Sequence, residues 1–384
     1  MNNNISVGII ADWLVSYSGA ERVISEIIKL YPSCELYSVI DFISESNRKY
    51  FNGKHAKTTF IQQLPKSKTS YQKYLPLMPL AIEQLDVSKH DILLSSSHAV
   101  AKGILVGPDQ LHICYVHSPI RYAWDLQHQY LKESGFNKGI KGMAVRYLLH
   151  KIRIWDQRTA NGVDHFIANS EFIARRIKKV YGRHSDVIYP PVDINRFKLK
   201  ENKENYYLTA SRLVPYKRID LIVEAFSNMP DKKLVVIGDG SEMNKIKLKS
   251  SKNIEILGYQ EDSVMQEYMR NAKAFVFAAE EDFGITPVEA MACGTPVIAY
   301  GKGGVLETVI PIGNEKPTGL FFESQTVDAI TNAVIQFEEV ETMILPEYCR
   351  ERAEKFATER FRLEMNNYIL DKWQEHEFRK TIKY

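Results

Sequence analysis

The sequence predicts an α/β chain built from two domains that each contain a parallel sheet. The chain has 384 residues, which at roughly 150 residues per domain suggests two or three domains. Short apolar runs alternate with segments of helical spacing, a pattern typical of parallel sheets covered by helices on both faces. The alternation starts again after the Pro190-Pro191 pair, so we expect a domain boundary there.

The elements expected in the first half are strands separated by helices. Residues 5–11 form an apolar run that predicts a buried strand, and residues 20–30 carry aliphatic side chains at helical spacing. Further strands are expected at residues 91–95, 112–117 and 164–168. Ser170 is expected to cap a helix that starts at Glu171.

The second half repeats the same pattern. We expect a strand at residues 206–210 and a helix at residues 219–226. The other expected strands are residues 233–238, 253–257, 274–277 and 295–299. The charged stretch 351–384 at the end of the chain is expected to be helical.

Composition excludes several classes of function. The 50 basic and 47 acidic residues give a net charge of +3, too balanced for bulk nucleic-acid binding. The four cysteines form no C-x-x-C pair, which argues against a zinc knuckle and fits a reducing cytoplasm. No stretch of 18 apolar residues and no signal peptide are evident, so we expect any membrane contact to be peripheral. Phosphate-binding loop, dinucleotide, D-x-D and H-E-x-x-H motifs are missing.

The segment 280–299 is the most informative one. Glu281 and Glu289 are eight residues apart and follow the expected strand 274–277. One interpretation is a capping box, with Thr286 at the N-cap, Pro287 at the first helical position and Glu289 two residues later. The other is a pair of carboxylates that accept hydrogen bonds from sugar or ribose hydroxyls. The pattern alone leaves both open.

Cations and small residues follow other expected strands. Arg212 and Lys217 lie in a proline-containing loop after the strand 206–210, so both are expected at the carboxyl edge of the sheet, where ligands bind in open parallel sheets. A solvated basic turn is the alternative. Gly19 opens the first helix, whose N-terminus favours an anion, and His117 ends a strand. A structural role is the alternative for His117.

Together these segments resemble the retaining glycosyltransferases of family 4, which have the GT-B architecture of two Rossmann-like domains facing each other across a cleft. The likeness covers nearly the whole chain. Its most specific part is the E-x7-E segment from Glu281 to Glu289, and Arg212 with Lys217 matches the family's R-x4-K pair. A glycine loop at residues 303–304 fits as well. One departure is Ser18, which precedes Gly19 where many relatives have a second glycine.

The resemblance implies a role for each candidate residue. Arg212 and Lys217 would stabilise the leaving diphosphate, and Glu281 would hold hydroxyls of the donor sugar. His117 would contact the same sugar, and Glu289 would hold the ribose. The implied catalytic residues are His117, Glu281, Arg212 and Lys217, and the implied donor-binding residues are Gly19, Arg212, Lys217, Glu281, Phe283, Gly284, Ile285 and Glu289. Neither a metal nor a cofactor is implied, and no nucleophile is assigned.

The resemblance also implies domain roles and substrates. Residues 1–192 would bind the acceptor, residues 193–365 the nucleotide sugar, and a helix at 366–384 would pack back toward the first domain. Residues 115–131 and 211–218 look most like bacterial α-mannosyltransferases of O-antigen and lipopolysaccharide biosynthesis. The implied donor is GDP-mannose, and the implied acceptor is a glycan on undecaprenyl diphosphate. A UDP-sugar donor, a non-catalytic assembly scaffold and a nucleotide-sugar epimerase are the alternatives.

One further feature suits a lipid-linked acceptor. From residue 46 to residue 82 the sequence has no acidic residue, and seven cations are interleaved with aromatic and aliphatic side chains. This composition is typical of contact with an anionic membrane surface. An ordinary solvated face over core aromatics is the alternative. We therefore expect a cytoplasmic protein attached peripherally to the inner face of the plasma membrane.

Overall fold

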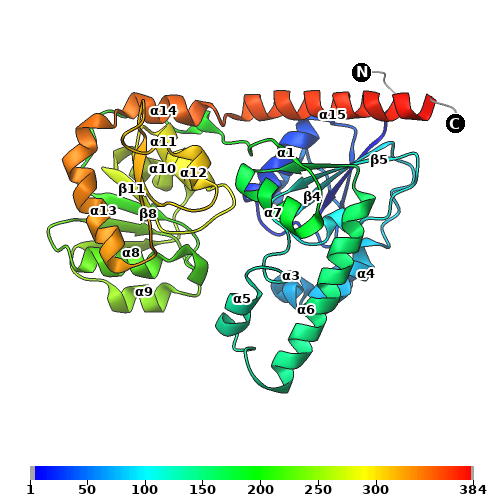
Figure 1. Ribbon diagram of the computed structural model, residues 1–384, viewed down its shortest axis with the longest axis horizontal. Helices are drawn as coiled ribbons and strands as arrows, with labels where there is room; N and C mark the ends of the chain where they lie inside the picture. The colour runs from blue at the N-terminus through cyan, green and yellow to red at the C-terminus, as the bar shows by residue number, and fades with distance from the viewer. Residues whose placement is uncertain (1–4, 382–384) are drawn as a thin grey trace. The chain divides into compact units, whose positions relative to one another are not determined.

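The computed structural model describes residues 5–381, and its contacts divide the chain into two compact units. The first unit comprises residues 1–189 and 361–384, and the second comprises residues 190–360. Each unit has its own sheet with helices packed on it (Figure 1). The α/β fold expected from the sequence is therefore confirmed.

The sheet of the first unit has seven parallel strands in the order β3-β2-β1-β4-β5-β6-β7. The strands are β1 (Val7–Ala11), β2 (Glu35–Ser38), β3 (Lys57–Thr58), β4 (Ile92–Ser97), β5 (Leu111–Val116), β6 (His165–Ala168) and β7 (Asp186–Val187). The central strands β1, β4 and β5 are buried along their whole length, although β4 ends in three serines and β5 contains His112. The chain order reverses between β1 and β4, so a topological switch point opens at their carboxyl ends.

The chain between residues 19 and 181 also forms helices and 3₁₀ turns, some of which pack against this sheet. The helices are α1 (Gly19–Leu30), α2 (Glu45–Arg48), α3 (Ser67–Ser70), α4 (Met78–Ile82), α5 (Gln127–Glu133), α6 (Gly139–Thr159) and α7 (Glu171–Tyr181), with the 3₁₀ turns η1 (Lys49–Phe51), η2 (Phe60–Gln63), η3 (Tyr71–Leu77), η4 (Ala101–Gly103) and η5 (Ala160–Gly162). The expected cap of α7 is confirmed, since Ser170 Oγ accepts a hydrogen bond from the Ile173 amide at 3.2 Å. The strands β2, β3 and β7 and the long helix α6 were not predicted.

The second unit has six parallel strands in the order β10-β9-β8-β11-β12-β13. They are β8 (Tyr207–Ala210), β9 (Leu234–Ile237), β10 (Ile254–Gly258), β11 (Ala274–Phe277), β12 (Val297–Tyr300) and β13 (Gly319–Phe322). Five of them match the expected strands, and only β13 was not predicted. Here the order reverses between β8 and β11, so the carboxyl ends of these two neighbours mark the switch point.

The helices of the second unit complete its α/β layers. They are α8 (Ile219–Ser227), α9 (Met243–Lys249), α10 (Asp262–Asn271), α11 (Ile285–Ala292), α12 (Val305–Thr308), α13 (Val327–Val340) and α14 (Pro346–Glu354), with the 3₁₀ turns η6 (Ile194–Arg196), η7 (Pro215–Lys217) and η8 (Glu341–Met343). The expected helix at residues 219–226 is confirmed as α8.

The end of the chain forms two helices where the sequence suggested one. The chain leaves α14 after Glu354, and three residues separate it from the start of α15 (Thr358–Thr381). From Phe361 onward α15 belongs to the first unit, where Phe361, Met365 and Ile369 are buried in its core. Arg362 adds an ion pair to Glu26 of α1, with 2.6 Å between Nε and Oε2. These contacts fix the helix on the first unit.

Candidate functional site

The switch point of the second sheet brings two predicted residues together. Lys217 lies in the loop after β8, and Glu281 lies in the loop after the adjacent strand β11. They form an ion pair in which the lysine side chain is 14% exposed and the glutamate side chain is 17% exposed. Because strand order alone dictates that these loops are neighbours, the contact follows from the topology. The pair places opposite charges at the edge where a charged ligand would enter.

Arg212 lies in the same loop as Lys217 and is exposed to solvent. Its backbone is fixed at both ends, because Ser211 donates to the Ile237 carbonyl at 3.1 Å and Leu213 donates to the Asp239 carbonyl at 2.9 Å. The guanidinium therefore extends from an anchored loop into solvent. Such a cation is suited to bind a phosphate oxygen.

The loop after β11 leads into the N-terminus of α11. Gly284 occupies the N-cap with φ of +84°, a left-handed conformation that favours glycine. The first amide groups of α11, including that of Ile285, have no acceptor within the helix, and the helix dipole makes this end positive. The preceding Phe283 is 3% exposed and packs on Phe356 with ring centroids 5.4 Å apart. An anion-binding helix end thus directly follows the Lys217–Glu281 pair.

The capping-box interpretation of this segment is wrong. The helix begins at Ile285, so Thr286 and Pro287 lie inside its first turn and Gly284 is the N-cap. Glu289 then lies in the second turn, beyond reach of an N-cap amide. Its side chain is buried, with 4% of the residue exposed. Its assignment to the ribose stays a prediction.

Two pairs of glycines hold the site loops, and the sequence reasoning assigned no positioning role to either. Gly303 and Gly304 pack against the backbone of Glu281 and its neighbour, and a Cβ atom at either position would overlap a carbonyl oxygen. Gly304 also donates to the Glu281 carbonyl at 2.8 Å. Gly238 and Gly240 after β9 make the same close approach to the loop that carries Arg212. Only glycine permits such backbone contact.

We expect Gly303→Ala to damage this site more than Gly313→Ala does. Both glycines have positive φ, +83° and +92°, so both variants incur similar backbone strain. Only at Gly303 would the new methyl group overlap the Glu281 backbone, whereas nothing lies within 4 Å at Gly313. The overlap should add about 1–3 kcal/mol to the loss of stability. Urea unfolding followed by circular dichroism would measure it, and equal losses in the two variants would contradict the positioning role.

His117 directly follows β5, the strand next to the switch point of the first sheet. A 2.8 Å hydrogen bond joins its Nε2 to Ser96 Oγ at the end of β4, and the Asn169 amide donates to its carbonyl at 3.1 Å. Burial lowers the pKa of His117 to about 3, and the neighbouring His98 acts in the same direction. The imidazole is therefore neutral near pH 7. A neutral ring can hydrogen-bond a sugar hydroxyl but is a poor proton donor.

We expect the imidazole of His117 to show no titration between about pH 5 and 8. The lowered pKa means that protonation favours the unfolded state, so His117 reduces stability only as the pH falls below about 6.5. Long-range ¹H–¹⁵N correlation spectra would show the ring as a single neutral tautomer across this range. A midpoint near pH 6.5, the ordinary value for histidine, would contradict the assignment.

Asp12, which the sequence reasoning missed, organises the loop beside His117. Its carboxylate accepts hydrogen bonds from four successive amides, those of residues 98–101, at 2.5–3.0 Å. It also pairs with His98 Nδ1 at 2.9 Å. Burial opposes its ionisation, but the His98 charge and these hydrogen bonds outweigh it and lower the pKa of Asp12. An aspartate directly after the first strand was the available signal.

Gly19 is the first residue of α1, as expected, but a carboxylate already occupies part of this helix end. Glu21 accepts hydrogen bonds from the Ser18 amide at 3.1 Å and from Ser18 Oγ at 2.7 Å. Burial raises the pKa of Glu21, which favours its neutral form. Gly19 and His117 belong to the first unit, and the other predicted site residues belong to the second.

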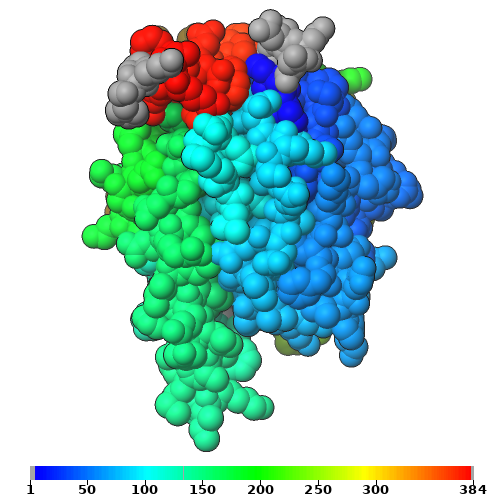
Figure 2. Space-filling model, turned by 90° about the vertical axis from the view of Figure 1, so that its right-hand side faces the viewer, coloured from blue at the N-terminus to red at the C-terminus, as the bar shows by residue number. Residues whose placement is uncertain are grey.

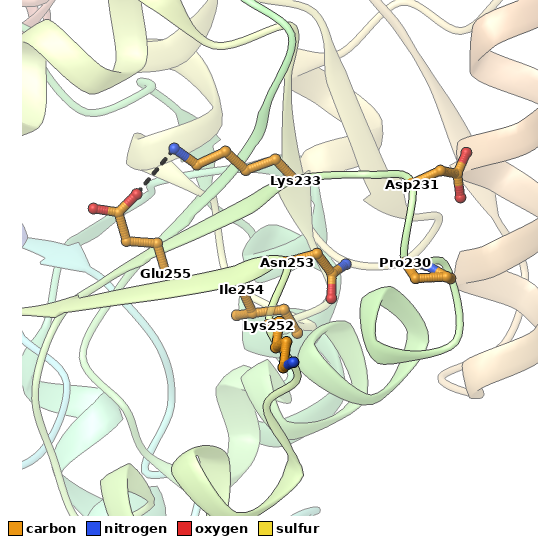
Figure 3. A pocket seen from close by; sticks show the side chains of 7 residues that line it. All are labelled: Pro230, Asp231, Lys233, Lys252, Asn253, Ile254 and Glu255. Carbon is orange, nitrogen blue, oxygen red and sulfur yellow. Dashed lines mark ion pairs between the residues drawn. The ribbon is translucent and has the colours of Figure 1, made fainter.

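The hollow shown in Figure 3 lies away from these residues. It measures about 530 Å³ and is lined by Pro230, Asp231, Lys233, Lys252, Asn253, Ile254 and Glu255. These residues stand at the amino ends of β9 and β10, the opposite edge of the sheet from the Lys217–Glu281 pair. Lys233 and Glu255 pair across it at 3.0 Å. Within residues 5–381, no group of three or more His, Cys, Asp and Glu side chains is arranged to hold a metal ion.

Comparison with known proteins identifies both halves of the chain. Residues 17–196 match the family model "Glycosyltransferase Family 4", and residues 192–356 match "Glycosyl transferases group 1". Among solved structures, the Anabaena protein HepE in complex with UDP aligns with 96% of this chain and 100% of its own, at a TM-score of 0.69 and 17% identity. Sucrose-phosphate synthase from Thermosynechococcus elongatus aligns with 96% of this chain and 99% of its own, at a TM-score of 0.71 and 15% identity.

Two units with doubly wound parallel sheets have the architecture of the GT-B fold, which these solved structures share. The family matches make the assignment specific: the chain belongs to the family 4 glycosyltransferases.

Curated relatives include mannosyltransferases. A GDP-mannose-dependent monoacylated α-(1-6)-phosphatidylinositol monomannoside mannosyltransferase from Corynebacterium glutamicum is 31% identical over 205 residues, which cover 45% of this chain and 52% of that protein. An α-1,3/1,6-mannosyltransferase from Candida glabrata is 25% identical over 243 residues, which cover 48% of this chain and 53% of that protein. The chain thus spans about half the length of the curated relatives it matches.

Proposed function

We propose that the protein is a retaining α-mannosyltransferase that moves mannose from GDP-mannose to a lipid-linked oligosaccharide. The observation that carries the proposal is the Lys217–Glu281 pair at the switch point of the second sheet, next to the N-terminus of α11. One carboxylate and one ammonium there suit a ligand that joins sugar hydroxyls to a diphosphate. The mannosyltransferase relatives support mannose as the sugar.

The leaving diphosphate would be stabilised by fixed positive charge. Arg212, Lys217 and the N-terminus of α11 would surround the oxygens on which negative charge develops as the sugar–phosphate bond breaks. Lys217 would exchange its contact with Glu281 for one with the diphosphate, which releases the carboxylate to accept hydrogen bonds from the sugar. We propose that the reaction requires no metal ion.

The neutral His117 would hydrogen-bond a hydroxyl of the donor sugar. This role fits a ring whose pKa of about 3 rules out protonation near neutral pH. Asp12 would act as a positioning residue, because it fixes the loop of residues 98–101 beside the ring. Gly19 would allow the diphosphate to approach the start of α1, and Glu289 would hold the ribose.

The proposed acceptor is a glycan on undecaprenyl diphosphate, in the assembly of O-antigen and lipopolysaccharide at the inner face of the plasma membrane. Within the described residues, none of the helices is both long enough and apolar enough to cross a bilayer. Contact with the lipid-linked acceptor would then be peripheral. The first unit would bind the acceptor, and the second would bind the donor.

A UDP-sugar donor is the second candidate. HepE, whose fold this chain shares, was solved with UDP and with UDP-glucose. No residue described above distinguishes a guanine from a uracil base. The fold and the charge arrangement would serve either donor, so the experiment has to decide between them.

The test is transfer of label from GDP-mannose, UDP-glucose, UDP-galactose and UDP-N-acetylglucosamine to membrane extracts that contain lipid-linked acceptors. We expect label from GDP-mannose alone to enter the lipid fraction, and to vanish with Glu281→Ala. Transfer of label from a UDP-sugar would contradict GDP-mannose as the donor and would identify that UDP-sugar as the donor instead. A new nucleotide sugar formed without acceptor would indicate an epimerase. A protein that neither transfers any sugar nor binds GDP or UDP would be a scaffold.

A further inference from the structure

The long helix α6 of the first unit carries apolar side chains on two opposite faces. One face packs on the unit, where Leu149 and Ile152 are buried. Figure 1 and Figure 2 show the N-terminal half of the helix and the loop before it extending away from the body of this unit. The other face of α6 is therefore exposed to solvent along much of its length.

The exposed face has an apolar stripe that Lys151 interrupts once. Ile140, Met143, Tyr147 and Ile154 are 81%, 62%, 60% and 52% exposed. Together with Lys151 they follow at intervals of three, four, four and three residues, which places them on one side of the helix. Leu148, which is 39% exposed and follows Tyr147 in the chain, widens the patch. An exposed apolar patch of this extent marks a binding surface.

The charges around the stripe have one sign. No aspartate or glutamate occurs from residue 134 to residue 155. Lys138, Lys141 and Lys151 are exposed, and Lys151 Nζ lies 5.4 Å from the centre of the Tyr147 ring. Arg146 and Arg153 instead donate to backbone carbonyls at 2.6 and 2.7 Å. An apolar stripe flanked by exposed lysines matches a surface with anionic head groups over an apolar interior.

The base of α6 is fixed to the unit by a buried polar cluster. Asp156 forms an ion pair with Lys102 at 2.7 Å and accepts from Trp124 Nε1 at 2.7 Å. Lys102 also donates to Thr159 Oγ1 at 2.9 Å. The exposed half of α6 therefore extends from an anchored base.

We propose that the α6 stripe inserts into the head-group region of an anionic bilayer and holds the first unit at the membrane surface. The inference rests on the proposed function, because a lipid-linked acceptor lies in such a bilayer, and it names the surface that meets the lipid. A second copy of the chain is the competing occupant. It is disfavoured because pairing two stripes would bring lysines of like charge together.

This surface differs from the one that the sequence indicated at residues 46–82. There the structure places Phe51 and Met78 in the core, and Tyr50 stacks on Tyr17 with ring centroids 4.1 Å apart. Arg48 is buried and pairs with Asp41 at 2.7 Å. Several of the apolar side chains of residues 46–82 therefore stabilise the folded unit by packing inside it. The exposed residues Phe60, Leu77 and Leu80 remain on its surface.

The test is co-sedimentation of the full chain with vesicles of phosphatidylglycerol and phosphatidylcholine, compared with phosphatidylcholine alone. We expect binding to the anionic vesicles, and at least about tenfold weaker binding for Ile140→Ser/Met143→Ser/Tyr147→Ser. Leu363→Ser/Phe378→Ser removes side chains that are 62% and 68% exposed on α15 and is the matched control. It should bind like the wild type. Lys138→Gln/Lys141→Gln/Lys151→Gln should lose the preference for anionic vesicles.

Three outcomes would overturn the proposal. The first is that the wild type shows no preference for anionic vesicles. The second is that the stripe variant binds vesicles as well as the wild type does. The third is that the wild type is a dimer and the stripe variant is a monomer, with no change in vesicle binding. Wild-type tryptophan fluorescence of each variant shows that the first unit is folded, because all four tryptophans belong to that unit. Vesicle binding without sugar transfer would refute only the proposed function, and transfer to a detergent-solubilised acceptor without vesicle binding would refute only this inference.

Discussion

Replacing Arg212 and Lys217 with alanine is expected to lower kcat/KM for the nucleotide sugar by at least about 10²–10³-fold without changing the unfolding transition. These are two of the three cations of the loop after β8, and electrostatic stabilisation of a developing charge is worth about this much for one preorganised group. Arg212 is exposed, and Lys217 contributes to the unit through its pair with Glu281. Partly exposed pairs add little stability, so the fold should survive.

The measurement is initial-rate kinetics with the donor identified by the transfer panel, together with thermal unfolding of each variant. Lys316→Ala is the matched control, because it removes one exposed cation of the same unit, whose partner is Glu351. That variant should keep wild-type kinetics. If the double variant turned over at the wild-type rate, the two cations would not stabilise the leaving group. If it lost activity and also unfolded, the loss would say nothing about electrostatics.

Local sequence patterns were sufficient to predict the central strands and the positions of the cations in the loop after β8. Strand β11 was predicted to the residue, because a short apolar run between polar loops is distinctive. The position of Lys217 was predicted from one general rule, that ligands bind at the carboxyl edge of an open parallel sheet, but its ion pair with Glu281 was not predicted. Strands β3 and β7 have two residues each and leave no periodic signal.

Other features could not be predicted from local sequence patterns, and some of them depend on contacts between residues far apart in the chain. The partners of Asp12 are amides 86–89 residues away, so no local pattern reveals them. The start of α11 was misplaced because Thr286 and Pro287 also suit the first turn of a helix, and only the left-handed Gly284 decides where the helix begins. Helix α6 was missed because apolar residues on two opposite faces obscure the single-faced periodicity of an ordinary surface helix.

Lys102→Met is expected to lower the unfolding free energy of the first unit by about 3–5 kcal/mol, the usual cost of removing one partner of a buried ion pair. Lys102 and Asp156 have 2% and 0% of their side chains exposed and pair at 2.7 Å. Without the ammonium, the Asp156 carboxylate would remain buried, with Trp124 Nε1 and Tyr181 Oη as its hydrogen-bond donors. Two neutral donors do not compensate a buried charge.

The second variant, Lys102→Met/Asp156→Asn, tests that explanation. Asparagine keeps an acceptor for Trp124 and Tyr181 and removes the charge, so it should recover most of the loss, to within about 1–2 kcal/mol of the wild type. Urea unfolding followed by tryptophan fluorescence reports the first unit, because all four tryptophans (Trp13, Trp124, Trp155 and Trp373) belong to it. A double variant as unstable as Lys102→Met would show that lost packing around the lysine, with its ring contacts to Trp155 and Tyr181, and not the unpaired carboxylate, sets the cost.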